Sequence, residues 1–168
     1  MHRSRRLVLV RHAKAEAFAA SDAERALTER GRADAAELGR WLADIGIIPD
    51  AAHVSDAVRT RQTWAEVAAA AGWALTPHID AHLYGCEEDG VLEIVRAADD
   101  AHTTLVVIGH NPTMGSLVQW LDDGEGDHTG AALTGFPTSA AAVLEFDGEW
   151  DDVAPASARL ADFHVGRS

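Results

Sequence analysis

Arginine and histidine side chains follow three apolar stretches that have the character of buried strands. Arg11 and His12 end the first stretch, Ser55 ends the second with Arg59 one helical turn later, and His110 ends the third. The planar guanidinium of arginine matches phosphate oxygens. Neutral imidazole is a nucleophile at physiological pH, because its ordinary pKa is about 6.5. These residue types indicate a small anion pocket whose histidine could take a phosphoryl group and surrender it to water.

The elements that must position these side chains can be read from the periodicity of apolar residues. Apolar and β-branched runs predict strands at 6–11, 51–54, 103–108 and 140–146. Apolar residues at helical spacing, with capping residues, predict helices at 31–45, 57–71, 89–98 and 112–122. We also expect a short edge strand at 75–79, a loop at 124–135, a hairpin at 147–148 leading to 149–153, and a last strand at 158–163.

Alternating strands and helices predict an α/β fold: a three-layer sandwich with a mostly parallel central sheet flanked by helices. No linker divides the chain, so residues 1–168 are expected to form a single domain. Ligands bind such sheets beyond the carboxyl ends of the parallel strands. Helices beginning near Ala57 and Pro112 would add backbone N–H donors and positive dipole ends at that rim. Arginines can stabilise the charge on a phosphoryl group there without a metal ion.

Composition narrows the function classes. The 168 residues carry 14 Lys and Arg against 27 Asp and Glu, a net charge of −13, which argues against a broad face for binding nucleic acid. The single cysteine, Cys86, excludes an intramolecular disulfide and a cysteine-rich zinc site. No run approaches the roughly 20 apolar residues of a membrane span, and Arg11 and His12 interrupt the only N-terminal apolar run. We therefore expect a cytoplasmic protein without membrane partners.

Taken in order, the motifs resemble those of the histidine phosphatase superfamily, whose fold is phosphoglycerate mutase-like. The likeness is strongest to its small phosphohistidine phosphatase branch, the SixA type. It covers nearly the whole chain and rests on the segments 7–14 (LVLVRHAK), 27–32 (LTERGR), 55–63 (SDAVRTRQT), 83–84 (LY), 109–112 (GHNP) and 136–138 (FPT). Asp56 stands where a proline is common in the family.

The resemblance implies a role for each matched residue. His12 is the implied nucleophile, which becomes phosphohistidine during turnover, and Arg11, Arg59 and His110 are implied to hold the phosphoryl oxygens. His110 is expected to be cationic in the transition state. Arg25 resembles a further arginine of the substrate loop, although Ala26 replaces the usual proline. The same motifs give further substrate-binding positions: Asn111 and Thr138.

The sequence contains no residue that can be clearly identified as a general acid. Larger members of the superfamily use a carboxylate to protonate the departing ester oxygen. Glu87 and Glu88 lie in the corresponding region, but they could equally stabilise the N-terminus of the next helix. An imidazole leaving group departs more readily than an alkoxide. A site without a strong acid therefore favours protein phosphohistidine over alkyl phosphates.

Other interpretations remain open from the sequence. The chain could be a phosphatase of small phosphomonoesters, or a non-catalytic phosphate-binding module that keeps the fold. A metalloenzyme is disfavoured, because the pair His78 and His82 has metal-ligand spacing only on a helix, which Pro77 opposes. We expect no metal and no cofactor. The expected partner is a phosphorylated protein or a small phosphate ester, and the sequence leaves the oligomeric state open.

Overall fold

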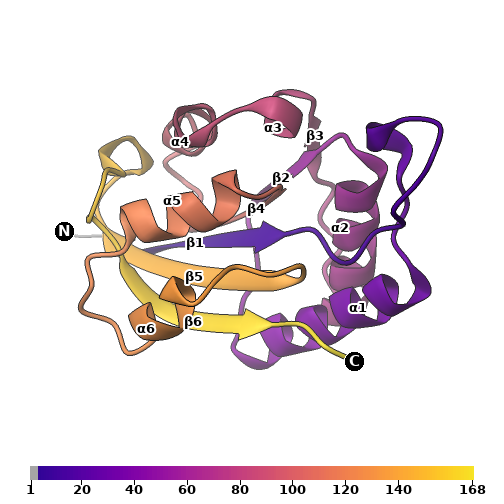
Figure 1. Ribbon diagram of the computed structural model, residues 1–168. Helices are drawn as coiled ribbons and strands as arrows, with labels where there is room; N and C mark the ends of the chain where they lie inside the picture. Colours follow the sequence, from indigo (N-terminus) through magenta and orange to yellow (C-terminus); the bar gives the residue numbers. More distant parts are fainter. Residues whose placement is uncertain (1–3) are drawn as a thin grey trace.

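The computed structural model describes residues 4–168, and its centre is a six-stranded sheet (Figure 1). The strands run in the spatial order β3-β2-β4-β1-β5-β6. Their bounds are β1 Ser4–Arg11, β2 Ala51–Ser55, β3 His78–Asp80, β4 Thr104–Gly109, β5 Ala140–Asp147 and β6 Arg159–Val165. Neighbours from β3 to β1 pair in parallel, whereas β5 and β6 pair antiparallel at the other edge. The predicted fold class is therefore confirmed.

Helices cover both faces of the sheet, and the side chains of β1 show how. Leu7 and Leu9 point into a core shared with helices α4 (Glu88–Arg96) and α5 (Thr113–Leu121). Val8 and Val10 point into a second core beneath helices α1 (Glu29–Asp44) and α2 (Val58–Ala71). Successive side chains of a strand face opposite sides of a sheet. An unbroken apolar run is therefore what a strand between two helical layers requires.

Two segments differ from the sequence prediction. The predicted loop at 124–135 contains a short helix, α6 (Thr129–Leu133), which buries Ala132. The segment 149–153 forms a 3-10 helix, η2 (Trp150–Asp152), in place of the predicted strand. Glu149 and Asp152 cap that turn reciprocally, while the Trp150 indole is buried beneath the Arg5 guanidinium and donates to the His102 carbonyl at 2.8 Å. Burial of one aromatic ring and local capping outweigh the hairpin signal there.

The other predicted elements lie close to their predicted places, and two further short helices occur where none was predicted. The hydroxyl of Thr28 accepts from the Gly31 amide at 2.9 Å, so α1 begins at Glu29, two residues before its predicted start. His78 lies in β3 and stacks on His53. His82 is the first residue of the four-residue helix α3 (His82–Gly85), so the two histidines do not share a helix. A single-turn 3-10 helix, η1 (Asp22–Glu24), lies in the connection between β1 and α1. No helix within residues 4–168 is long and apolar enough to cross a membrane.

Candidate active site

The carboxyl ends of β1, β2 and β4 meet at one edge of the sheet, as their parallel pairing requires. Arg11 at the end of β1 is in register with Gly109 at the end of β4, and the amide of His12 donates to the Gly109 carbonyl at 3.1 Å. The rings of His12 and His110 consequently lie 5.4 Å apart between centroids. Two histidines 98 positions apart in the sequence thus become neighbours through strand register alone.

His12 is buried and its ring orientation is fixed. Its Nδ1 lies 2.7 Å from the carbonyl oxygen of Ala13, which can only accept, so Nδ1 carries the proton and Nε2 holds the free lone pair. Burial lowers the pKa of His12 to about 4, and the positive charges of Arg59 and Arg11 act in the same direction. The imidazole is therefore neutral at pH 7, which is the form that can attack phosphorus.

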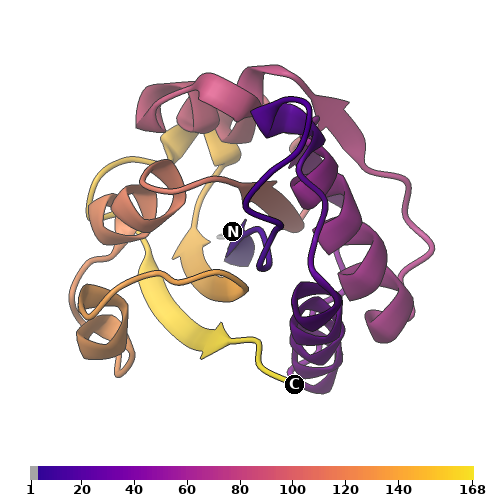
Figure 2. The same ribbon diagram turned by 45° about the vertical axis from the view of Figure 1, so that its right-hand side comes forward.

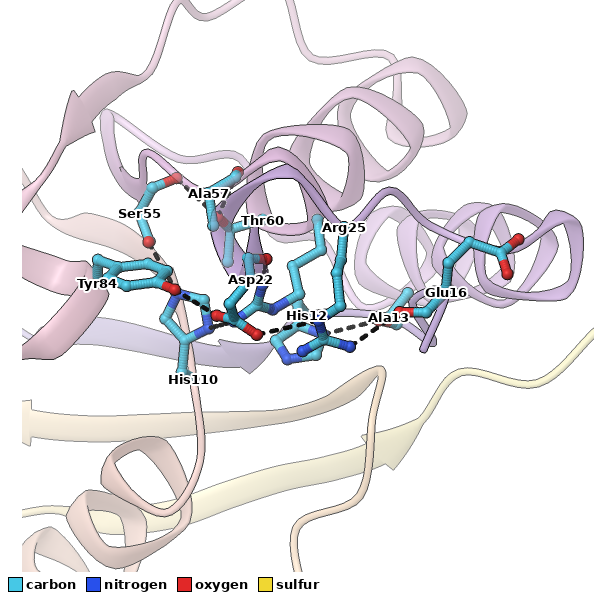
Figure 3. A network of polar contacts seen from close by, with 11 residues as sticks. His12, Ala13, Glu16, Asp22, Arg25, Ser55, Ala57, Thr60, Tyr84 and His110 are labelled. Carbon is cyan, nitrogen blue, oxygen red and sulfur yellow. Dashed lines mark hydrogen bonds and ion pairs between the residues drawn. The ribbon is translucent and has the colours of Figure 1, made fainter. Parts of the chain in front are cut away.

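His110 is held by two polar neighbours. The Nε2 atom lies 2.8 Å from Ser55 Oγ, and the Nδ1 atom lies 3.4 Å from Nη2 of Arg59. An arginine only donates, so Nδ1 accepts and Nε2 donates to the serine hydroxyl (Figure 3). Burial, followed by the charge of Arg59, lowers the pKa of His110 to about 4. His110 is therefore neutral at pH 7, and a bound dianion would raise that pKa and favour the cation.

Two arginines present buried N–H groups that have no protein partner. Arg59 is 6% exposed and Arg11 is half-buried, and the Nε atom of each lacks a hydrogen-bond acceptor among residues 4–168. Arg11 donates from Nη1 to the Phe136 carbonyl at 3.3 Å, and burial lowers its pKa. A buried unpaired donor on a cation is costly unless a ligand satisfies it. An oxyanion beside His12 would supply that acceptor.

Asp22 is the one site residue that the motifs did not point to. Its carboxylate accepts from Arg59 Nη2 at 3.0 Å, from Arg25 Nε at 3.0 Å and from the hydroxyl of Tyr84 (Figure 3). The Asp22 carbonyl also accepts from Arg59 Nη1 at 2.8 Å. The hydrogen bond from Tyr84, together with both arginines, holds the pKa of Asp22 well below its usual range. Asp22 is thus a fixed anion at the mouth of the site.

The remaining predicted substrate-binding residues are engaged in other contacts. Arg25 binds Asp22 and also donates to the Glu16 carbonyl at 2.9 Å. Asn111 donates to the Phe136 carbonyl at 2.7 Å and accepts from the Gly115 amide, so its side chain links the segment after α6 to the first turn of α5. Thr138 lines a separate hollow with charged neighbours: Lys14, Arg30, Asp34 and Arg167. Contact of these three residues with substrate stays a prediction.

The two glutamates considered as general acids lie at the start of α4. Glu87 is exposed at the N-cap position and lines a pocket of about 320 Å³ together with His110 and Tyr84. Glu88 is the first residue of the helix and is not among the residues that line that pocket. Glu87 therefore shares a pocket with His110, a candidate catalytic residue.

Contacts from three other parts of the chain fix the backbone around His12. The Ala13 amide donates to Thr63 Oγ1 at 2.9 Å, and the His12 carbonyl accepts from the Ser139 amide at 3.1 Å. Gly31 packs so closely that a Cβ there would lie 2.0 Å from the Lys14 carbonyl oxygen, which explains why glycine is required in the segment 27–32. Contacts with Thr63, Ser139 and Gly31 therefore hold the backbone on both sides of the His12 side chain in place.

A second pocket, of about 470 Å³, opens on the Arg11 side of the site and is walled largely by Phe136, Pro137 and Phe163. Together with the cavity beside His110 it leaves room for a leaving group. Within residues 4–168, no group of three or more His, Cys, Asp or Glu side chains is arranged to hold a metal ion. Neutral imidazole, two arginines with free donors and adjoining pockets form an arrangement that can bind a phosphoryl group and exchange it.

A family model and a protein of Mycobacterium tuberculosis match the sequence of this chain. Residues 7–87 match the family model described as the histidine phosphatase superfamily (branch 1). An uncharacterized protein of Mycobacterium tuberculosis (strain H37Rv) is 38% identical over 162 residues, which cover 94% of this chain and 100% of that protein.

Solved structures of similar proteins extend the likeness to the whole fold. A protein described as a candidate phosphohistidine phosphatase SixA from Nakamurella multipartitia has a TM-score of 0.85 at 33% identity, over 97% of this chain and 96% of that chain. The protein histidine phosphatase SixA in complex with tungstate has a TM-score of 0.79 at 25% identity, over 95% of this chain and 96% of that chain. The chain therefore belongs to the histidine phosphatase superfamily and is a hydrolase similar to its phosphohistidine phosphatases.

Proposed function

We propose that the protein is a metal-independent phosphatase that works through a phosphohistidine formed on His12. The observation that carries this proposal is the state of His12: buried, neutral, and held by the Ala13 carbonyl so that Nε2 is the free nitrogen. Arg11 and Arg59 supply cationic N–H donors around it, and His110 supplies a ring that can gain a proton when a dianion binds.

The reaction has two displacements at phosphorus. In the first, the lone pair of His12 Nε2 forms a bond to phosphorus while the bond from phosphorus to the leaving group breaks with its electron pair. In the second, water attacks phosphorus, the bond to Nε2 breaks, and inorganic phosphate leaves with the water oxygen. The second displacement restores neutral His12, and the surplus proton passes to solvent. The arginines stabilise the charge on the equatorial oxygens in both steps.

Protein phosphohistidine is the substrate that this site favours. The carboxylate nearest to Arg59 belongs to Asp22, whose lowered pKa keeps it ionised, so it has no proton to give to an alkoxide. A phosphohistidine protonated on its second ring nitrogen leaves as neutral imidazole and needs no such acid. The likeness to solved SixA structures, one of them holding the oxyanion tungstate, supports the same substrate class.

Hydrolysis of small phosphomonoesters is the second candidate, because Glu87 lines the pocket beside His110. We would measure phosphate release in the presence of a chelator from a histidine-phosphorylated protein and from an alkyl phosphomonoester. His12→Ala is the blank, and Glu87→Gln tests for the acid. Preference for phosphohistidine, lost in His12→Ala and kept in Glu87→Gln, supports the proposal. Faster turnover of the ester that depends on Glu87 would support the second candidate, and release independent of His12 would exclude both.

A further inference from the structure

The connection between His12 and α1 presents an apolar tip to solvent. The four residues at the tip, Ala17 to Ala20, are all exposed, and Phe18 is 90% exposed, more than any other large hydrophobic side chain within residues 4–168. A single exposed apolar residue is ordinary. Four in succession at the end of a loop are not, since such positions usually carry polar or turn-forming residues.

The loop is held in shape beneath this tip. The Glu16 amide donates to the Ala26 carbonyl at 2.8 Å, and Arg25 donates across the base to the Glu16 carbonyl at 2.9 Å. Ser21 donates to Glu24 at 3.1 Å on the returning side. Exposure of the tip is therefore a property of the folded loop. A preorganised contact costs less ordering entropy when a partner binds.

The tip adjoins the candidate active site. Asp22, two residues after Ala20, binds Arg59, and a hollow of about 350 Å³ joins it to the tip. The residues lining that hollow are Ala17, Phe18, Ala19, Ser21, Asp22 and Arg25. Figure 2 shows this indigo loop projecting from the carboxyl edge of the sheet, beside the start of α2. A molecule whose phosphoryl group reaches His12 therefore has this tip within reach of its remaining surface.

We propose that the apolar tip, residues 17–20, is the docking surface for the phosphorylated protein, and that it contacts apolar residues flanking the substrate's phosphohistidine. This inference rests on the proposed function and specifies how its substrate is recognised. The hollow beside the tip supports this choice of partner, because Asp22 lines that hollow and also binds Arg59. A small phosphate ester has no apolar surface that would reach Phe18 while its phosphoryl group lies at His12.

The test compares phosphohistidine peptides that differ only in apolar flanks. One series of nine-residue peptides carries a leucine one to four positions from a single phosphohistidine, the matched series carries serine there, and free phosphohistidine is the small reference. We expect kcat/KM for the best leucine peptide to exceed that of its serine match by about fivefold to tenfold. Phe18→Ser should remove this preference and leave turnover of free phosphohistidine unchanged within about twofold, since an apolar docking contact acts on the flank alone.

Ile48→Ser is the matched control variant. Ile48 is 74% exposed and precedes the amino end of β2, whereas His12 follows the carboxyl end of β1. Loss of the Ile48 side chain should therefore leave the leucine preference intact. Absence of a leucine preference in the wild type, or its persistence in Phe18→Ser, overturns the docking surface alone. An equal loss on all substrates in Phe18→Ser also overturns it, since the loop would then act through Arg59.

Two further results would test which molecule binds the apolar tip and whether the protein is a phosphatase. A dimer seen by sedimentation at assay concentration, abolished by Phe18→Ser with peptide preferences unchanged, would assign the tip to a second copy of this chain and overturn the proposal. His12-independent or absent hydrolysis of free phosphohistidine would overturn the proposed function and the docking surface together. Turnover that requires His12 but ignores Phe18 overturns the docking surface only.

Discussion

The Oδ2 atom of Asp22 lies 3.0 Å from Nη2 of Arg59, across 37 positions of sequence. The side chain of Asp22 is 54% exposed on its loop, whereas the side chain of Arg59 is 7% exposed beneath it. A carboxylate of the chain itself therefore partly neutralises a guanidinium that we expect to hold the phosphoryl group. The same carboxylate accepts from Tyr84, so three segments of the chain meet at one pair of charges.

Removing the Asp22 charge should strengthen oxyanion binding. Asp22→Asn keeps an oxygen that can accept from Arg59 and keeps the backbone carbonyl contact, but it ends the neutralisation of the guanidinium. We expect tungstate to bind about two- to fivefold more tightly, a modest gain because Asp22 is exposed to solvent. Calorimetric titration at pH 7 measures it, with Glu24→Gln on the same loop as the control. Weaker binding would show instead that the carboxylate is needed to hold Arg59 in place.

Arg59 should not be replaceable by lysine. The guanidinium contacts the Asp22 carbonyl, the Asp22 carboxylate and His110 Nδ1, and its buried Nε has no hydrogen-bond partner within residues 4–168. An ammonium group cannot reproduce this planar fork. We expect Arg59→Lys to lower kcat/KM for a phosphohistidine substrate by about 10²-fold. Arg61→Lys on the exposed face of α2 is the matched control, and a loss equal to that control would contradict this role.

The sequence alone predicts the parts of this molecule that follow from chain periodicity. The run Leu7–Val10 identifies a strand buried on both faces, and Arg11 and His12 stand at its end. Parallel pairing of β1 with β4 then brings His12 beside His110, which the rule for ligand sites in open α/β sheets predicts. The sheet and the grouping of its terminal residues are consequences of the order and spacing of residues along the chain.

Contacts made by loop residues of the site cannot be predicted from the periodicity of the sequence. Asp22 lies on an exposed connection without periodicity, and only the folded course of that loop brings it to Arg59 and Tyr84. The contacts of the Asn111 side chain illustrate the same limit. Its motif position is next to His110, yet its amide is occupied by the Phe136 carbonyl and the Gly115 amide. Side-chain partners from distant loops decide these cases, and sequence spacing does not report them.

His12 and His110 should both stay neutral at pH values well below the ordinary histidine pKa of about 6.5. Burial lowers the pKa of His12 and of His110 to about 4, so neither should titrate between pH 5.5 and 8 in the free protein. Nitrogen-15 NMR of the imidazoles measures this directly. Bound tungstate should raise the pKa of His110, because an anion favours the imidazolium. Titration of either ring near 6.5 in the free protein would contradict the buried, neutral site.

The same shift makes His12 a source of acid instability. The folded pKa is about 4 and the unfolded value is the ordinary 6.5, so between these values the unfolded chain binds the extra proton. Stability contributed by neutral His12 is therefore present above pH 6.5 and is lost as the pH falls toward 4. Glutamine does not titrate. On going from pH 8 to pH 5, His12→Gln should lose about 2 kcal/mol less unfolding free energy than the wild type in urea denaturation. Parallel losses would contradict the shift.

Trapping the covalent intermediate would show directly whether His12 is the nucleophile. Phosphohistidine tolerates alkali, so turnover of a phosphohistidine protein would be stopped within milliseconds at high pH, and the enzyme would be digested and sequenced by mass spectrometry. The free lone pair of His12 is on Nε2, because Nδ1 donates to the Ala13 carbonyl. We therefore predict one phosphoryl group per chain, on His12, attached to Nε2 and absent from His12→Ala. A phosphoryl group on Nδ1 or on any other residue, or turnover without a phosphorylated His12, would contradict the account.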